Sequence, residues 1–212
     1  MSSNVALPFA RPSKIVCVGR NYADHARELG NDVPREPLLF LKPPSSLVPS
    51  GQAIHLPAAS TQVEYEGEIG VLLGRRLRDA SEAEALASVA QLLAANDVTA
   101  RDLQRLDSQW TRAKGFDTFC PVGVPHEPPA DLTTLSVVTR VNGEERQRGT
   151  VAQMVFTIPF LLSYISRVMT LDPGDLVLTG TPAGVGALRA GDEVEVEVVG
   201  LSTVRNPVRA HS

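Results

Sequence analysis

The hydrophobic pattern of this chain consists mainly of short apolar segments separated by turn residues. Most are four to seven residues long and rich in β-branched or aliphatic side chains, which predicts buried strands. One longer segment alternates acidic and apolar positions and predicts a further strand. The predicted strands span residues 14–19, 38–41, 64–73, 176–179 and 193–199. In addition, segments 137–141 and 144–148 flank Asn142-Gly143, a pair that favours the type I′ turn of a hairpin.

Helical signals are fewer than strand signals. The predicted helices span 25–29, 81–95, a short segment after 97–102, and 157–166. The Ala-rich second helix opens at Ser81, with Glu84 placed for a capping box, and Asp24 is a candidate N-cap for the first helix. Many short strands, three or four helices and no βαβ rhythm predict an α+β protein with mixed or antiparallel sheets. We expect residues 1–13 to form an extended lead-in to a single domain over 14–212.

The composition excludes several classes of function. The chain has 212 residues, of which 43% are hydrophobic and 21% charged, and its net charge is −4. It therefore offers no broad positive field for nucleic acid or an anionic membrane surface. The longest mostly apolar run, 155–165, is too short to span a membrane, and no secretory signal pattern is present. Cys17 and Cys120 give no disulfide framework, so we expect inert core thiols in a cytoplasmic protein.

Three glutamates share one face of the predicted strand over 64–73. Because side chains alternate along a strand, Glu64, Glu66 and Glu68 point one way while the core-type residues point the other. Like charges this close repel one another. One interpretation is a solvated edge strand. The other is a hard divalent cation, which prefers oxygen ligands. Asp97 is a candidate third carboxylate, or else the N-cap of the helix that follows it.

Two other segments hold candidate chemistry. His25 and Glu28 lie three residues apart on a predicted helix, so the glutamate could orient the imidazole as a general base, or the two could form an exposed ion pair. Lys114, by spacing alone, is a solvent-facing lysine. Residues 178–186 form a Gly-rich turn that is neither a P-loop nor a dinucleotide motif. Its backbone amides and Thr181 could still bind a small anion.

Six motifs of this chain occur in the order found in one enzyme family. They are Gly19–Glu28, Phe40–Pro43, Glu66–Val71, Asn96–Asp102, Lys114–Asp117 and Leu178–Gly186. On these motifs the chain resembles the fumarylacetoacetate hydrolase family, from about Lys14 to Val208, and is most similar to short single-domain members acting on acylpyruvates or oxaloacetate. The resemblance implies a mostly β fold of the α+β class. This would be a mixed β-sandwich roll of the family's C-terminal-domain type, with a few short helices, in a homodimer.

The resemblance also implies the chemistry of a site. Its metal ligands would be Glu66, Glu68 and Asp97, holding Mg²⁺ or Mn²⁺, with Glu64 as a neighbour of the ligands. His25 and Glu28 would form a catalytic pair that activates water.

Further positions match those that hold the substrate in this family. Arg20, Lys114 and Thr181 would bind its carboxylate and 2-oxo group, and Gln104 is a further substrate-binding position. Lys114 would also be catalytic, by stabilising the oxyanion or the 2-oxo group.

The implied reaction is hydrolysis of a C–C bond in acylpyruvate-type 2-oxo acids, such as acetylpyruvate or fumarylpyruvate, through a pyruvate enolate that the metal stabilises. The alternatives are oxaloacetate decarboxylation and keto–enol tautomerisation or isomerisation of unsaturated 2-oxo dicarboxylates at the same metal site. A non-enzymatic module that binds small dicarboxylates is a further alternative. The helix over 25–29 and the loop over 30–37 would form a lid that orders when substrate binds.

Overall fold

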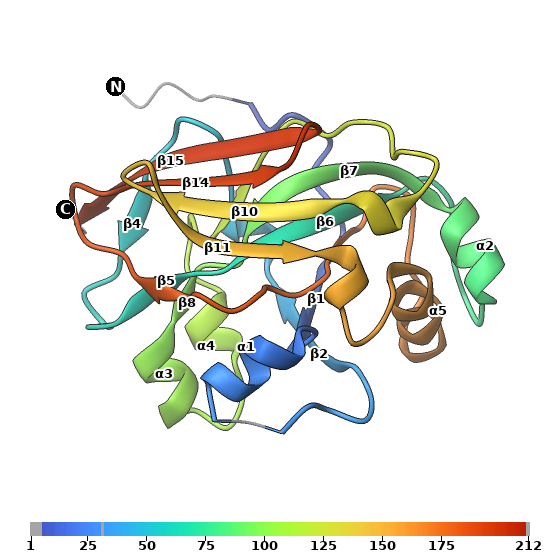
Figure 1. The fold of residues 1–212 in the computed structure, drawn as a ribbon, viewed down its shortest axis with the longest axis horizontal. Coiled ribbons are helices and arrows are strands. Elements are labelled where there is room, and N and C mark those ends of the chain that lie inside the picture. The colour runs from blue at the N-terminus through green and yellow to red at the C-terminus, as the bar shows by residue number, and fades with distance from the viewer. Residues whose placement is uncertain (1–5, 31, 211–212) are drawn as a thin grey trace.

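The computed structural model describes residues 6–30 and 32–210 of the chain. Most regular elements in this part are strands (Figure 1). The helices are α1 (Ala23–Glu28), α2 (Glu82–Ala87), α3 (Arg101–Leu106), α4 (Thr111–Lys114) and α5 (Ile158–Val168). Short 3₁₀ turns are η1 (Pro44–Ser46), η2 (Leu132–Thr134) and η3 (Val151–Gln153). The predicted class, mostly β with a few short helices, is confirmed.

The strands form three hydrogen-bonded sheets. They are β1 (Ile15–Gly19), β2 (Leu38–Lys42), β3 (Leu47–Pro49), β4 (Ile54–Leu56), β5 (Val63–Tyr65), β6 (Gly67–Leu73), β7 (Val89–Asn96), β8 (Thr99–Ala100), β9 (Cys120–Val122), β10 (Ser136–Val141), β11 (Glu144–Thr150), β12 (Leu176–Leu178), β13 (Gly186–Ala187), β14 (Glu193–Val198) and β15 (Ser202–Ala210). The sheet orders are β2-β1-β12-β6-β7-β9-β3, β11-β10-β14-β15-β4 and β13-β5-β8. The first two sheets mix parallel and antiparallel pairs.

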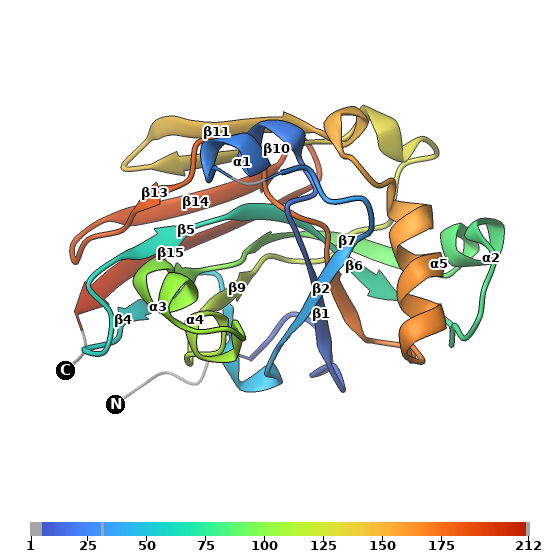
Figure 2. The ribbon, with the colours of Figure 1, turned by 90° about the horizontal axis from the view of Figure 1, so that it is seen from below.

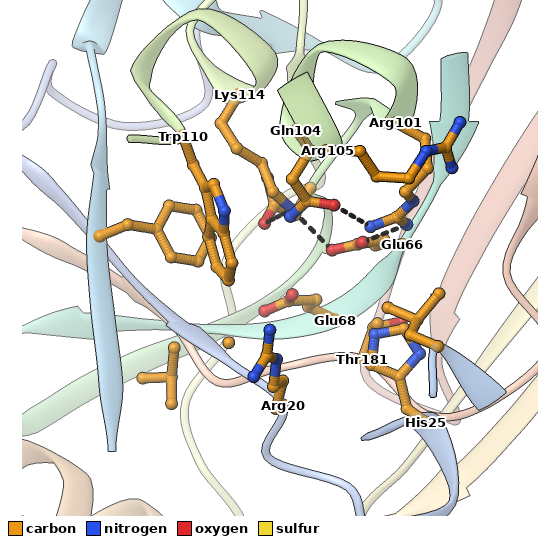
Figure 3. Close-up of a pocket in the computed structure, with 15 residues that line it drawn as sticks. Arg20, His25, Glu66, Glu68, Arg101, Gln104, Arg105, Trp110, Lys114 and Thr181 are labelled. Carbon is orange, nitrogen blue, oxygen red and sulfur yellow. Dashed lines mark hydrogen bonds and ion pairs between the residues drawn. The ribbon is translucent and has the colours of Figure 1, made fainter. Parts of the chain in front are cut away.

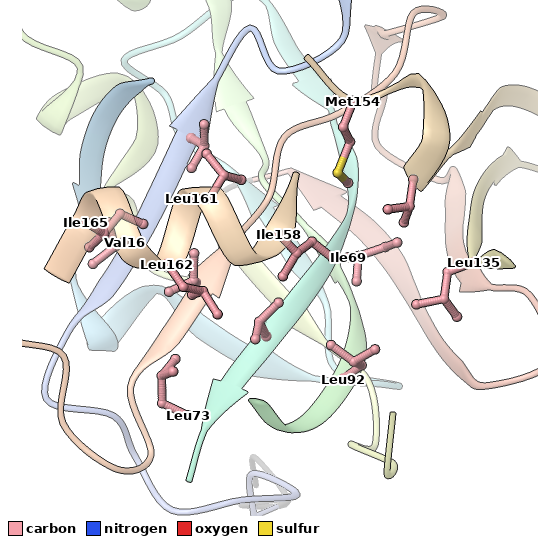
Figure 4. Packing of buried hydrophobic residues seen from close by; sticks show 14 of the residues in the cluster. Val16, Ile69, Leu73, Leu92, Leu135, Met154, Ile158, Leu161, Leu162 and Ile165 are labelled. Atoms are coloured by element: carbon pink, nitrogen blue, oxygen red, sulfur yellow. The ribbon is translucent and has the colours of Figure 1, made fainter. Parts of the chain in front are cut away.

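The main hydrophobic core lies on one face of the seven-stranded sheet. Strands of the five-stranded sheet and helix α5 both pack against this face, and α2 lies beside α5 at the same end of the molecule (Figures 1, 2 and 4). Ile69, Val71 and Leu73 of β6 point into this core, as the predicted alternation requires. Helix α5 starts as predicted, because the Thr157 side chain caps it and Pro159 is tolerated in its first turn.

The predicted helix over 81–95 is wrong beyond its first turns. The capping box of Ser81 and Glu84 forms, but α2 ends at Ala87 and the chain continues as strand β7. The alanines and leucines of this segment favour a helix by intrinsic propensity. They are instead enclosed, because β7 lies between β6 and β9 and most of its residues are buried. Burial on both faces of a sheet thus overrides a weak local preference.

The predicted strand over 64–73 is interrupted at Glu66. Strand β5 belongs to the three-stranded sheet, and β6 is a central strand of the seven-stranded sheet. At the break, the Glu66 backbone N–H donates to Asn96 Oδ1 at 2.9 Å, and its carbonyl accepts from the Asp97 N–H at 2.8 Å. The solvated edge interpretation is therefore wrong, since all three glutamates on this segment are buried.

Two local predictions near the chain's turns have opposite outcomes. The hairpin of β10 and β11 is confirmed, and Asn142 and Gly143 both adopt positive φ, at 52° and 83°, as a type I′ turn requires. The predicted cap at Asp24 is wrong, because Tyr22 is the N-cap of α1. Asp24 instead pairs with Arg27 on the helix surface.

Candidate active site

A cavity of ≈ 290 Å³ opens beside the break between β5 and β6. Its wall is formed by residues from α1, α3, α4, β1, β2 and β6 and by the turn after β12 (Figure 3). Eight of the nine predicted site residues line it. They are Arg20, His25, Glu66, Glu68, Asp97, Gln104, Lys114 and Thr181. The ninth, Glu28, contacts His25.

Glu66, Glu68 and Asp97 form a buried carboxylate cluster at the inner end of this cavity. One carboxylate oxygen from each lies within 4.8 Å of the others. Glu66 and Glu68 are on the same face because Gly67 separates them, and Asp97 follows β7, which pairs with β6. Asp97 is not a helix cap, because the N-cap of α3 is Ala100. Three carboxylates within this distance form the hard donor set that Mg²⁺ and Mn²⁺ prefer, so these residues fit a divalent metal site.

Buried cations from other elements pair with two of the three carboxylates, Glu66 and Asp97. Lys114 Nζ donates to Glu66 Oε2 at 2.7 Å and to Asp97 Oδ2 at 2.6 Å. Lys42 Nζ donates to Asp97 Oδ1 at 2.6 Å and to the Val98 carbonyl at 3.1 Å. The expectation of a solvent-facing Lys114 is therefore wrong, since only 2% of its side chain is exposed.

Arg101 links the cluster to the first glutamate of the segment. Its Nη2 atom donates to Glu66 Oε1 at 2.6 Å and its Nε atom to Glu64 Oε2 at 2.8 Å. The remaining Nη1 atom donates to Gln104 Oε1 at 2.5 Å. Glu64 is thus bound to Arg101 and lies outside the three-carboxylate cluster.

These pairs move the pKa values of the cluster in opposite directions. Burial by itself would raise the pKa of Glu66, but Lys114 and Arg101 outweigh it and hold that pKa far below its ordinary value. Burial raises the pKa of Glu68, and Asp97 and Glu66 raise it further. Burial would lower the pKa of Lys114, whereas Asp97 and Glu66 raise it above its ordinary value. Of the two glutamates in the cluster, Glu68 therefore takes up a proton more readily.

The Gly-rich turn over 178–186 holds carboxylates of the protein itself. The Gly180 N–H donates to Glu68 Oε2 at 2.6 Å. The Gly184 N–H donates to both oxygens of Glu28, at 3.0 and 3.1 Å. The Gly180 and Gly184 amides of this turn therefore bind side-chain carboxylates from β6 and α1. Binding of a separate small anion at this turn stays a prediction.

His25 and Glu28 form the pair expected from their spacing. His25 Nδ1 lies 3.3 Å from Glu28 Oε2, and the imidazole is buried while Glu28 is partly exposed. The interpretation as an exposed ion pair is therefore wrong for the histidine. A carboxylate at Nδ1 favours the tautomer with its proton on that nitrogen, which leaves Nε2 as an acceptor. This arrangement suits a general base.

Several residues of the cavity were not predicted from the sequence. Lys42 and Arg101 lie within quoted motifs, and a charged residue at the end of an apolar strand is the only signal for Lys42. An aromatic wall was also missed. Phe40 and Trp110 pack edge to face with ring centroids 5.2 Å apart, and Lys114 Nζ lies 5.0 Å from the Phe40 centroid. This wall gives the polar cavity one apolar side.

Comparisons with known proteins agree with this site. The family model "Fumarylacetoacetate (FAA) hydrolase C-terminal" matches residues 14–209. The chain is 46% identical to the rat protein named Oxaloacetate tautomerase FAHD1, mitochondrial, over 90% of this chain and 89% of the relative.

Two solved structures share the fold. One is the fumarylpyruvate hydrolase of Pseudomonas aeruginosa in complex with Mn²⁺ and pyruvate, with a TM-score of 0.88 and 32% identity over 94% of this chain and 91% of that one. The other is the 5-carboxymethyl-2-hydroxymuconate delta-isomerase of Mycobacterium smegmatis, with a TM-score of 0.88 and 42% identity over 95% and 80%. The chain shares the fold of these structures, one of which holds Mn²⁺, and its buried carboxylate cluster fits a divalent metal site. The chain belongs to the fumarylacetoacetate hydrolase family.

Two further features bear on the setting of the site. None of the helices in the described part of the chain combines the length and the apolar composition needed to span a membrane. Cys17 and Cys120 are both buried and unpaired, and burial raises the pKa of the Cys120 thiol to about 12. These thiols are therefore weak nucleophiles, as expected from the sequence.

Proposed function

We propose that this protein is a Mg²⁺- or Mn²⁺-dependent enzyme that forms the enolate of small 2-oxo acids. The observation that carries the proposal is the cluster of Glu66, Glu68 and Asp97 beside a histidine–carboxylate pair in one cavity. These three residues would hold the metal, which when bound would act as a Lewis acid toward the developing enolate charge. The relatives that bind Mn²⁺ and pyruvate or carry the name oxaloacetate tautomerase support this substrate class.

The protein's own residues would bind and orient the substrate. Arg20 lines the cavity, so its guanidinium would bind a carboxylate. Its backbone is in the left-handed region, with a φ of 60°. Lys114 would move from its carboxylate partners toward the 2-oxo group, and Gln104 would contribute a hydrogen bond. The wall of Phe40 and Trp110 would exclude water from one side of the substrate.

We favour keto–enol tautomerisation of oxaloacetate-type 2-oxo dicarboxylates as the main reaction. It moves one proton between the enol oxygen and the carbon next to the 2-oxo carbon, and it breaks no C–C bond. His25 Nε2 would take and return that proton, with Glu28 holding the imidazole. The rat tautomerase and the Mycobacterium smegmatis isomerase support this choice, because both are more than 40% identical to this chain.

Hydrolysis of acylpyruvates is the second candidate reaction. His25 would deprotonate a water molecule that attacks the distal carbonyl. The C–C bond would then break, and the departing pyruvate enolate would take up a proton to give pyruvate. The pair of His25 and Glu28 and the similarity to the fumarylpyruvate hydrolase favour this candidate.

A substrate panel tests the proposal. Oxaloacetate, acetylpyruvate and fumarylpyruvate are each assayed with Mn²⁺ and with a chelator, and the products separate tautomerisation, decarboxylation and hydrolysis. We expect His25→Ala to lower turnover about a hundredfold, the usual scale for a lost general base. The exposed His126 supplies the matched control, His126→Ala, which should keep native activity. Turnover that persists in chelator, or in His25→Ala, would refute the proposed roles.

Four wider expectations stay predictions. Light scattering tests the homodimer. Binding of small 2-oxo acids without turnover of any panel member would favour the non-enzymatic module. The single catalytic domain over 14–212 and the lid formed by the helix over 25–29 and the loop over 30–37 also stay predictions, and residue 31 of that loop lies outside the described residues.

A further inference from the structure

Gln147 is a buried side chain on a strand whose neighbouring side chains are mostly exposed. It lies on β11, where Arg146 and Arg148 on either side face solvent, and only 1% of Gln147 is exposed. Its cross-strand partner is Thr139 of β10, which is also buried. A buried amide requires hydrogen-bond partners. The partners of Gln147 lie at the break that carries the metal-ligand glutamates.

The hydrogen bonds of Gln147 fix the orientation of its amide. Its Oε1 atom accepts from the Gly67 backbone N–H at 2.9 Å. Its Nε2 atom donates to Thr181 Oγ1 at 2.8 Å and to the Pro182 carbonyl at 2.8 Å. A backbone N–H only donates and a carbonyl only accepts. The contacts at both ends of the amide therefore agree on which atom is Oε1 and which is Nε2.

This orientation of the amide also fixes the group to which the Thr181 hydroxyl donates its hydrogen. Since Thr181 Oγ1 accepts from Gln147, it uses its own hydrogen elsewhere, and it donates to the Gly67 carbonyl at 2.9 Å. The N–H and the carbonyl of Gly67 are therefore held by two side chains that also bind each other.

Gly67 separates Glu66 from Glu68, so these bonds hold both peptide groups that connect the two metal-ligand candidates. There is no room for a side chain at this position. A Cβ atom on Gly67 would lie 1.9 Å from Thr139 Oγ1. Side chains of the β10–β11 hairpin therefore pack directly against the break between β5 and β6.

We propose that Gln147 is a positioning residue. Together with Thr181 it clamps the two peptide groups around Gly67 and so sets the spacing of the Glu66 and Glu68 carboxylates for a divalent ion. This inference rests on the metal site of the proposed function. It extends that site to a residue from a hairpin that contributes none of its predicted ligands.

Titration of the metal alone tests the clamp. The Mn²⁺ dissociation constant is measured by calorimetry for the native protein, for Gln147→Met and for the control Gln153→Met, whose side chain is exposed near the same strand. We expect Gln147→Met to raise the constant about tenfold, the scale found for residues that orient metal ligands. The control should stay within twofold of native. A Gln147→Met value within twofold of native overturns the proposal.

A double-mutant cycle separates the clamp from a merely structural role. Because Gln147 and Thr181 bind each other, the rise in the Mn²⁺ dissociation constant in the Gln147→Met/Thr181→Val protein should be smaller than the product of the two single effects. A rise equal to that product contradicts a joint clamp.

A second pair of variants covers the case in which Gln147→Met does not fold. Thr181→Ser keeps the hydroxyl and should bind Mn²⁺ within twofold of native, whereas Thr181→Val should bind about tenfold more weakly. Equal Mn²⁺ dissociation constants for Thr181→Ser and Thr181→Val overturn the proposal. A native protein that binds Mn²⁺ but turns over no panel substrate refutes only the proposed reaction. A native protein that binds no Mn²⁺ refutes both.

Discussion

Replacing Lys42 with methionine tests how the carboxylate cluster is stabilised without a divalent ion. The Lys42 side chain is 0% exposed and binds Asp97, which is itself buried. Methionine has a similar volume and no charge, so the change removes the ion pair and leaves little empty space. The buried Asp97 carboxylate then keeps Lys114 as its remaining lysine partner.

The expected loss is large for a single substitution. Removing one partner of a buried ion pair destabilises a protein by about 3–5 kcal/mol, because the other charge stays buried. For a chain of this length, about 1 kcal/mol lowers Tm by about 2–4 °C. We therefore expect Lys42→Met to lower the Tm of the metal-free protein by about 6–20 °C.

Thermal unfolding with chelator and with Mn²⁺ measures this effect and its cause. A bound divalent ion supplies positive charge to Asp97, so the Tm gap between native and variant should narrow at a fixed Mn²⁺ concentration. Arg148→Met, which removes an exposed pair with Glu145, should cost at most about 1 kcal/mol. A Lys42→Met protein as stable as native in chelator would refute the reasoning. If Mn²⁺ does not narrow the Tm gap between native and variant protein, the loss of stability comes from packing and not from the unpaired charge.

Three further predictions concern Glu68, the pH dependence of Mn²⁺ binding and the N-terminal cap of α2. Because burial raises the pKa of Glu68, the folded metal-free protein binds a proton that the unfolded chain releases. The free energy of unfolding should therefore fall as pH rises from 4.5 through the raised pKa, and urea melts of native and Glu68→Gln protein check this slope. Mn²⁺ should bind more tightly over the same rise in pH, since metal ligands must be deprotonated, and calorimetry that shows no pH dependence would contradict this. Ser81→Ala removes the capping box of α2 and should cost about 1 kcal/mol in urea melts without changing Mn²⁺ affinity.

The alternation of side chains was sufficient to predict that Glu66 and Glu68 lie together and that Ile69, Val71 and Leu73 enter the core. The interruption at Glu66 was not predictable, because it depends on Asn96 and Asp97, some thirty residues away in the chain. The helix over 81–95 failed for a related reason. Its residues favour a helix locally, but only Glu82–Ala87 are helical, and pairing with the neighbouring strands β6 and β9 makes the rest of the segment a strand.

The cations of the site show the same limit. Lys42 contacts Asp97 across 55 residues, and Arg101 contacts Glu66 across 35. Spacing arguments apply within one helix or strand and carry no information about such contacts. The pair of His25 and Glu28 was predictable because both residues lie on one helix. The family motifs placed Asp97 near the glutamates, which spacing alone left open.

The lysines that pair with the carboxylate cluster affect how the folding of the protein depends on the supply of metal in a cell. Because Lys42, Lys114 and Arg101 pair with Asp97 and Glu66, the chain itself offsets much of the negative charge of the site, and we expect folding to depend little on metal. We therefore expect newly made chains to fold during a shortage of magnesium or manganese and to take up the ion later. Catalytic output would then rise and fall with metal supply, while the amount of folded protein stays constant.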